Sequence, residues 1–383
     1  HELRDEFTML MPWALPMSQP PALLTTVSQT AVSQTAVPPN SPIQKAWDDL
    51  IEALPITALL GELPAVCRNG KPAFNRLRDL ITPDSGSPEE VKEARAWCLE
   101  QASNLSSARM TAEGLIIGSK KLAEQAESFF QEMKFDFLFN EKRQLFHLGY
   151  NVSAERLDDN YYDLLASEAR IASLITIATG EVPETHWMHL ARPVAMVRNS
   201  RALLSWNGSM FEYLMPSLMV RRYEGMLLDQ TFSAVVQRQI EYGKQKGVPW
   251  GISEAGYYAF DTSLNYQYRG FGVPGLGFKR ELSEDLVISP YASLIALSIN
   301  PPAVLKNITS LKQIGMLATY GFYESIDYTR SRLSLGQESG VVRSFMAHHQ
   351  GMIMLSLVNY LQEDPIIRRF HADPRIESVD LLL

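Results

Sequence analysis

Apolar residues recur at the three- to four-residue spacing of an amphipathic helix along most of the chain. This pattern predicts helices over 43–54, 88–101, 103–133, 164–178, 231–243, 288–298 and 301–317, with two more beginning at 211 and near 340. Ser41-Pro42 and Ser87-Pro88 each place a hydroxyl cap before a proline, which suits the first helical position. The dipeptide Asn69-Gly70 predicts a turn. Residues 135–151 alternate apolar and polar positions and predict a hairpin-like extended segment.

This succession of helices predicts an all-α fold. The loops between the helices are rich in glycine, proline and aromatic residues. Paired antiparallel helices with long loops form an α-hairpin array, and the chain lacks the fixed-period repeat of an open solenoid. We therefore expect the array to close into an α/α toroid with long aromatic-rich loops at one end.

The 383 residues, 46% of them hydrophobic, are enough for one large domain or two. Residues 1–40 contain the short repeat VSQTAVSQTAVPPN and predict a linker or a surface arm. Residues 41–134 form an N-terminal helical part, and 135–383 form a second region that we expect to share one toroid with the preceding helices. Because the chain begins at His1, we expect it to be a segment of a longer protein.

The charge and the cysteines narrow the classes of function. A net charge of −8 without a stripe of Lys and Arg argues against a nucleic-acid partner. Cys67 and Cys98 have no metal-site spacing and suit a reduced compartment. The glycine-rich stretch 270–281 lacks the G-K-[ST] ending of a phosphate loop, so we reject a nucleotide site. His147, and His186 with His189, lack further ligands, so we expect no metal.

The stretch 248–269 offers the clearest chemistry. Glu254 stands among aromatic residues there, and the glycine, serine and asparagine content predicts a loop between helices. Aromatic faces beside isolated acids suit a sugar-binding cleft, because a pyranose ring stacks on Trp or Tyr while carboxylates handle protons or attack. The alternative is a buried aromatic cluster with a hydrogen-bonded structural glutamate.

A second carboxylate, Glu324, lies in the aromatic-rich stretch 319–332, and Glu338 in a Ser/Gly-rich loop is a reserve candidate. Near the middle of the helix predicted from about 340, three polar residues precede Gly351; we expect them to face a cavity, because the glycine interrupts the helix. We interpret Glu212 as a helix-capping carboxylate. Trp187 is either a sugar platform or a core residue. The candidates for lining a substrate cleft are Trp250, Tyr257, Asp261, Tyr266, Tyr268, Arg269, Tyr323, Asp327, His348, His349 and Gln350.

Several long motifs occur in a fixed order: LGYN, LDDNYYDLLASEARIAS, WNGSMFEYLMP, WGISEAGY, NYQYRGFGVPGLG, GFYESIDYT and VVRSFMAHHQGM. On these motifs, residues 135–383 resemble the middle, glucoamylase-like domain of cyclic β-1,2-glucan synthases. The chain is also similar to endo-β-1,2-glucanases. The resemblance implies an (α/α)6 toroid. It also implies a bacterial inner-membrane parent protein with a glycosyltransferase part and a phosphorylase-like part, and this domain on the cytoplasmic side.

The resemblance further implies that the domain closes linear β-1,2-glucan into a ring by transglycosylation, without a cofactor. Net retention of the β anomer needs two displacements through a glycosyl-enzyme intermediate. We expect Glu254 to be the nucleophile and Glu324 the acid/base. Asp261 and Asp327 are either sugar ligands or groups that support the site. Two rival functions are hydrolysis of β-1,2-glucan and non-catalytic holding of the glucan.

Overall fold

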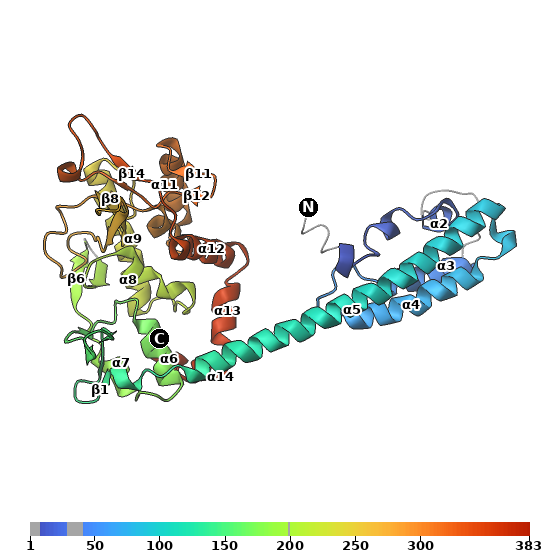
Figure 1. The fold of residues 1–383 in the computed structure, drawn as a ribbon, viewed down its shortest axis with the longest axis horizontal. Helices are drawn as coiled ribbons and strands as arrows, with labels where there is room; N and C mark the ends of the chain where they lie inside the picture. The colour runs from blue at the N-terminus through green and yellow to red at the C-terminus, as the bar shows by residue number, and fades with distance from the viewer. Residues whose placement is uncertain (1–7, 29–40, 198–199) are drawn as a thin grey trace. The chain divides into compact units, whose positions relative to one another are not determined.

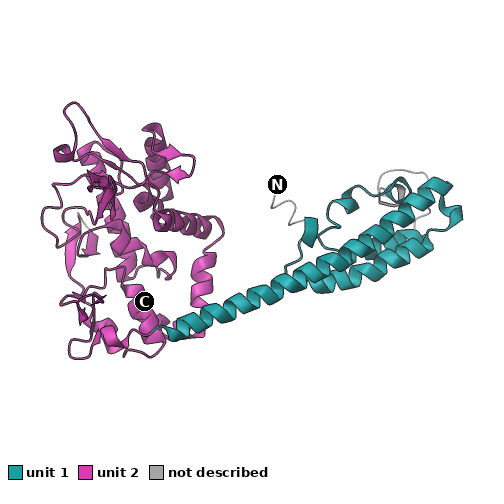
Figure 2. Ribbon diagram, viewed as in Figure 1, with its two compact units in different colours: residues 1–133 teal, residues 134–383 magenta. Residues whose placement is uncertain are grey.

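The computed structural model describes residues 8–28, 41–197 and 200–383. The chain divides into two compact units, residues 1–133 and 134–383, coloured separately in Figure 2. Each unit has its own hydrophobic core. The helices that follow one another in the sequence therefore belong to two units, each packed around its own core.

Unit 1 is a bundle of helices, in which α4 packs against both α3 and α5 (Figure 1). Its helices are α2 (Ala22–Ser28), α3 (Pro42–Ala53), α4 (Leu63–Leu80) and α5 (Pro88–Glu132), with short 3-10 turns at Pro16–Ser18 and Pro83–Ser85. The two predicted caps are confirmed: Ser41 Oγ accepts from the backbone N–H of Gln44 at 3.1 Å, and Ser87 forms a capping box with Glu90.

Two details of the helices in unit 1 differ from the sequence prediction. Helix α5 is continuous where we expected two helices, because nothing near Ala102 breaks it. Asn69-Gly70 lies inside α4 rather than at a turn. A Cβ at Gly70 would lie 2.5 Å from a methyl carbon of Leu54 and 3.0 Å from one of Leu105. The glycine therefore permits close packing instead of a turn.

The N-terminal stretch is also more ordered than a linker. Met11, Trp13 and Leu24 are buried in the core of unit 1. Of the two alternatives, a linker or a surface arm, the contacts of residues 8–28 favour an arm that packs on unit 1, because its apolar side chains gain by burial. Most of the repeat VSQTAVSQTAVPPN lies outside the described residues.

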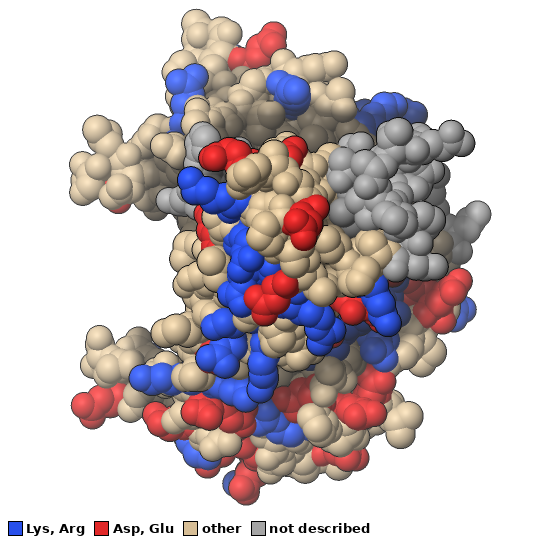
Figure 3. All heavy atoms as spheres, turned by 90° about the vertical axis from the view of Figure 1, so that its right-hand side faces the viewer, with Lys and Arg blue, Asp and Glu red and all other residues tan. Residues whose placement is uncertain are grey.

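Lys and Arg side chains gather on the face drawn in Figure 3. Among the cations of unit 1, Arg68, Lys71, Arg76 and Arg109 line a groove between α4 and α5. Several of them have partners, including Lys71 with Ser106 and Arg76 with Asp49. In the described part of the chain, no helix is long and apolar enough to cross a membrane.

Unit 2 combines helices with small antiparallel sheets. Its helices are α6 (Arg170–Ala178), α7 (Thr185–His189), α8 (Met210–Leu214), α9 (Leu227–Lys246), α10 (Pro290–Leu294), α11 (Pro301–Gln313), α12 (Ala347–Leu361), α13 (Pro365–His371) and α14 (Pro374–Ser378). Strands β1 (Phe139–Asn140), β2 (Leu145–His147) and β5 (Tyr161–Tyr162) form one sheet. Strands β10 (Val287–Ile288), β13 (Ser325–Asp327) and β14 (Gly340–Val342) form another.

Four two-stranded ladders complete the sheet structure of the described residues. They are β3 (Tyr150–Asn151) with β4 (Arg156–Leu157), β6 (Val194–Val197) with β7 (Ser200–Leu203), β8 (Ala255–Phe260) with β9 (Tyr266–Arg269), and β11 (Leu317–Ala318) with β12 (Gly321–Phe322). The extended segment predicted at 135–151 is confirmed by β1 and β2. The chain as a whole is mostly helical, with few and short strands.

Other predicted elements of unit 2 have different bounds. The helix expected over 164–178 begins only at Arg170, because Leu164 bridges to Ala191. The expected loop 248–269 contains the β8–β9 hairpin. The last long helix begins at Ala347, not near 340, since Gly340 to Val342 pair with β13. In each case tertiary pairing overrides the local pattern.

Candidate active site

Glu254 lies immediately before strand β8, and its side chain is half-buried. The pKa of its carboxyl is raised to about 7, first by burial and then by the nearby charges of Glu168 and Glu212, against the opposing effect of Lys279. A carboxyl with this pKa holds its proton near neutral pH. That is the property required of a general acid.

Glu212 is buried and occupied as a helix cap. Its oxygens accept from the hydroxyls of Ser205 and Ser209, both at 2.9 Å, and from the backbone N–H groups of Asn207 and Ser209, also at 2.9 Å. Together with Ser209 it forms the capping box of α8, which confirms its interpretation as a capping carboxylate. Its acceptor positions are therefore already used by protein donors.

Glu168 is the other carboxylate beside Glu254, and it is much less occupied. It lies two residues before α6, is half-buried and accepts from the Ser167 hydroxyl at 3.2 Å. Burial raises its pKa, and the charge of Glu212 adds to the rise. The pKa of Tyr162 is also raised, first by burial and then by the charges of Glu168 and Glu254, so this tyrosine lies near both carboxylates. The charge of Glu168 therefore favours the protonated form of Glu254.

Glu324 has a different environment from Glu254. Its side chain is 2% exposed at the start of β13, one oxygen accepts from the backbone N–H of Gly256 at 3.0 Å, and the other lies 2.9 Å from His349 Nδ1. The carboxylate thus connects β8, directly after Glu254, with the start of α12. This geometry suits a group that positions the Glu254 segment.

An aromatic and imidazole stack lies behind the two segments. The Tyr291 ring stacks on His349 with ring centroids 3.7 Å apart, and its hydroxyl donates to Ser253 Oγ at 2.8 Å and to the Glu254 carbonyl at 2.9 Å. Tyr268 lies 3.4 Å from His349 Nε2. Burial raises the pKa of Tyr268, and the charges of Glu254 and Glu324 raise it further. Tyr268 is 41% exposed, so part of this residue faces solvent near both glutamates, while its hydroxyl lies beside buried His349.

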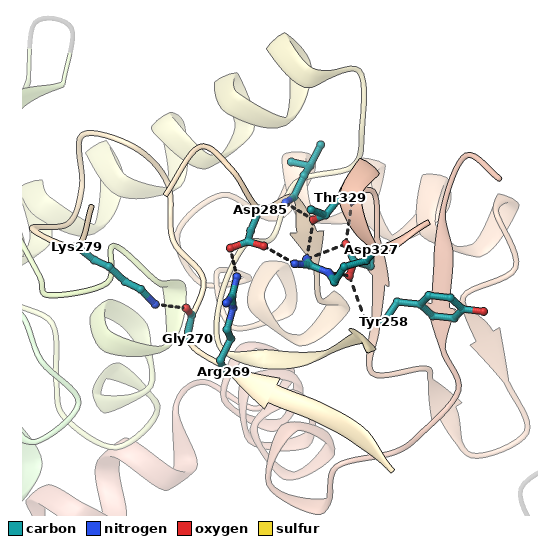
Figure 4. Close-up of polar contacts among 9 residues, drawn as sticks. Tyr258, Arg269, Gly270, Lys279, Asp285, Asp327 and Thr329 are labelled. Carbon is teal, nitrogen blue, oxygen red and sulfur yellow. Dashed lines mark hydrogen bonds and ion pairs between the residues drawn. The ribbon is translucent and has the colours of Figure 1, made fainter. Parts of the chain in front are cut away.

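The base of the β8–β9 hairpin is fixed by alternating charges (Figure 4). Asp327 is fully buried and accepts from the backbone N–H of Tyr258 at 3.1 Å and from Arg332 Nε at 2.7 Å. Arg332 also reaches Asp285 at 2.5 Å, and Asp285 pairs with Arg269. Asp327 therefore supports the hairpin rather than offering its oxygens to a sugar.

The remaining predicted cleft residues occupy several environments. Trp250 is 6% exposed and belongs to the core, as does Trp187 at 2%. Asp261 is exposed and closes the hairpin turn by accepting from the backbone of Ser263 and Asn265. Tyr257 is partly buried and packs beneath Arg269 and Arg332.

The segment around α12 also departs from expectation. His348 is exposed, and burial together with the charge of His349 lowers its pKa. Gln350 donates to the Phe322 carbonyl at 3.0 Å. These residues lie in the first turn of α12, which runs through Gly351 with open space beside it, so the glycine neither interrupts the helix nor mediates close packing. Three further candidates have no contact with Glu254 among those described. The Tyr266 hydroxyl accepts from the backbone N–H of Arg343, and Tyr323 packs on Phe345. Glu338 is exposed.

The structure brings Glu168 into the site, and the sequence prediction missed it. The sequence predicts one helix over 164–178, which places Glu168 within that helix and does not indicate that it lies beside Glu254. One signal in the sequence could have identified Glu168: the polar pair Ser167-Glu168 lies between two apolar stretches of the motif LDDNYYDLLASEARIAS. Among the described residues, no group of His, Cys, Asp and Glu has the arrangement of a metal site.

Comparison with known proteins shows which family this region belongs to. Residues 160–374 match the model of the family described as putative glucoamylase. The cyclic β-(1,2)-glucan synthase NdvB of Rhizobium meliloti (strain 1021) is 47% identical over 262 residues, which are 68% of this chain and 9% of that protein. The chain thus spans about a tenth of that relative's length.

Two solved structures are also similar. One is an endo-β-1,2-glucanase from Talaromyces funiculosus with sophorose, at a TM-score of 0.42 and 11% identity, covering 82% of this chain and 63% of that one. A mutant of the same enzyme with β-1,2-glucan gives a TM-score of 0.41, with the same identity and coverage. The family match spans more than half of the chain and contains Glu168, Glu212, Glu254 and Glu324. The chain belongs to the putative glucoamylase family.

Proposed function

We propose that this chain acts on linear β-1,2-glucan and closes it into cyclic β-1,2-glucan by intramolecular transglycosylation. The observation that carries the proposal is the half-buried pair of Glu254 and Glu168, in which the pKa of Glu254 is raised to about 7. The substrate class follows from the 47% identity to a cyclic β-(1,2)-glucan synthase. Tyr268, which is 41% exposed and lies near Glu254, supplies an aromatic face for a sugar.

The roles differ from those that the sequence favoured. Glu254 acts as the acid/base, because its proton is retained to about pH 7. Glu168 acts as the nucleophile, because its oxygens are less occupied than those of Glu212. Glu324 supports Glu254 through the backbone of Gly256.

The reaction then takes two balanced displacements. In the first, a Glu168 oxygen bonds to the anomeric carbon, the β-1,2 bond breaks, and Glu254 gives its proton to the departing hydroxyl. In the second, a hydroxyl at the other end of the same chain attacks that carbon, its proton passes to Glu254, and the bond to Glu168 breaks. The ring forms with the β configuration retained.

The proposal also includes the larger setting expected from the sequence. The helices of unit 2 would belong to an (α/α)6 toroid. The parent protein would carry glycosyltransferase and phosphorylase-like parts at the bacterial inner membrane, with this domain on the cytoplasmic side.

Product analysis tests the proposed function. The chain is incubated with long linear β-1,2-glucan, and the products are measured by mass. Transglycosylation predicts rings that are one water lighter than linear glucans with the same number of glucose units. Shorter linear products would instead indicate hydrolysis, and an unchanged glucan that still binds would indicate a holding module. Either of these results contradicts ring closure.

A further inference from the structure

Trp206 is a large aromatic residue that remains exposed near the carboxylates. Its side chain is 49% exposed, although it belongs to a turn that leads directly into the capped helix α8. The indole N–H donates to Asp163 Oδ1 at 2.9 Å, and the ring packs against Phe278 with centroids 5.6 Å apart. The indole is therefore held in one orientation while part of its surface faces solvent.

A cavity of about 460 Å³ lies beside this indole. Its lining includes Trp206, Tyr161, Asp163, Asp159, Asn160 and Arg143. The Arg143 guanidinium lies over the Tyr161 ring at 4.7 Å, and the Tyr161 hydroxyl accepts from Asn140 at 3.1 Å. Flat aromatic surface thus occurs next to carboxylate, amide and guanidinium groups, the combination that recognises the faces and hydroxyls of a sugar.

The charges of the lining narrow the chemistry of the ligand. The lining contains one cationic side chain, Arg143, and two carboxylates, Asp159 and Asp163. Asp163 already accepts a hydrogen bond from the Trp206 indole. This balance disfavours a phosphate or another anion. A neutral ligand with many hydroxyl groups fits the lining better.

Two chain segments connect this cavity with the carboxylate pair. In strand β5, Tyr161 lines the cavity, while the next residue, Tyr162, feels the charges of Glu168 and Glu254. Successive side chains of a strand point to opposite sides, so β5 separates the cavity from the pair by one strand. In the second segment, Trp206 lines the cavity and the following N–H, of Asn207, donates to Glu212, whose charge raises the pKa of Glu254.

We infer that the Trp206 cavity is a secondary subsite that binds glucosyl residues of the same β-1,2-glucan chain, away from the bond that reacts. The inference rests on the proposed function, because it takes the glucan as the ligand. A remote subsite suits ring closure, since the chain must be held at a second point for its far end to return. Its contribution is to binding and not to the bond-breaking step.

The test compares Trp206→Ala with Phe129→Ala, which removes a 66% exposed aromatic side chain from α5 in unit 1. Binding of long linear β-1,2-glucan is measured by calorimetry, and KM and kcat are measured for the same glucan. We expect Trp206→Ala to weaken binding and raise KM by about tenfold, the effect of losing about 1.4 kcal/mol of stacking, with kcat changed less than about twofold. Phe129→Ala should behave as the unchanged chain.

Two more variants separate ligand contact from structural damage. Trp206→Phe keeps an aromatic face and should recover most of the affinity, and Tyr161→Ala should raise KM by removing the neighbouring ring. Thermal unfolding shows whether each variant is folded. Unchanged KM and affinity in both Trp206→Ala and Tyr161→Ala, with the parent chain active, would overturn the subsite alone. A parent chain that neither binds nor converts the glucan would overturn the proposed function, and the subsite with it.

Discussion

The two units bury different kinds of side chain. Among the described residues of unit 1, Gln101 is the one buried side chain that is polar, and the rest of the core is apolar. Unit 2 buries Arg170, Glu212, Glu324, Asp327 and His349, among others. Burying polar and charged groups is unfavourable unless each finds a partner, and in unit 2 these five groups do so. Unit 1 is thus organised for packing, whereas unit 2 accepts the cost of a polar interior around the carboxylates.

The largest expected difference between the units concerns catalysis. Changing Glu168→Gln removes the proposed nucleophile and should lower the rate of conversion of linear β-1,2-glucan by about 10²–10⁴-fold or more. The matched change Glu113→Gln in α5 removes a carboxylate that pairs with Arg109 at 3.9 Å on the surface of unit 1, and should leave the rate unchanged. Initial rates of product formation measure both. Comparable rates for the two variants would remove Glu168 from the mechanism.

The next largest difference should be in how much an ion pair of each unit contributes to the free energy of unfolding. Asp327→Asn leaves Arg332 without its buried partner and should lower the free energy of unfolding by about 3 kcal/mol. Asp49→Asn breaks the exposed pair with Arg76 in unit 1 and should change it by less than about 1 kcal/mol. Urea unfolding of the two variants gives both values. Equal small losses would mean that the charged network under the β8–β9 hairpin contributes little.

The two units can also be compared through the same substitution of a buried glutamine in each. Gln239 in α9 donates to the Ile252 carbonyl at 2.8 Å and accepts from its N–H at 2.9 Å, so Gln239→Leu leaves two buried backbone groups without partners and should cost about 2 kcal/mol. Gln101 Oε1 has no partner among the described residues. Gln101→Leu should therefore change stability by less than about 0.5 kcal/mol, or stabilise unit 1 slightly. A larger loss for Gln101→Leu than for Gln239→Leu in urea unfolding would reverse the comparison.

The pH dependence of the reaction is the smallest of these effects. The acid form of Glu254 is required, and its pKa is raised to about 7, so the protonated fraction falls as pH rises above that value. The rate should therefore fall by about tenfold for each pH unit above about 7. A pH profile measured with the intact chain checks this. A rate that keeps rising to pH 9 would mean that Glu254 does not supply the proton.

The sequence predicted unit 1 better than unit 2 because local pattern decides more of unit 1. The caps at Ser41 and Ser87 and the spacing of apolar residues correspond to observed helices. In unit 2, short strands form only by pairing with distant segments, as Gly340–Val342 does with Ser325–Asp327. No local pattern contains that information.

The site was predicted in part for the same reason. Aromatic neighbours identified Glu254 and Tyr268, which lie together in the structure. The same criterion also selected Trp250, which is a core residue, because burial in a core and stacking on a sugar use the same side chains. Glu168 has few aromatic neighbours in sequence, and only the fold brings it to Glu254.

The most direct test of the central claim is the rate of Glu254→Gln with long linear β-1,2-glucan. The variant keeps the size of the side chain but cannot exchange a proton, and thermal unfolding verifies that it is folded. The claim that Glu254 transfers the proton predicts a rate lower by about 10²–10⁴-fold, with glucan binding retained. A folded Glu254→Gln variant that forms product within about threefold of the parental rate would contradict it.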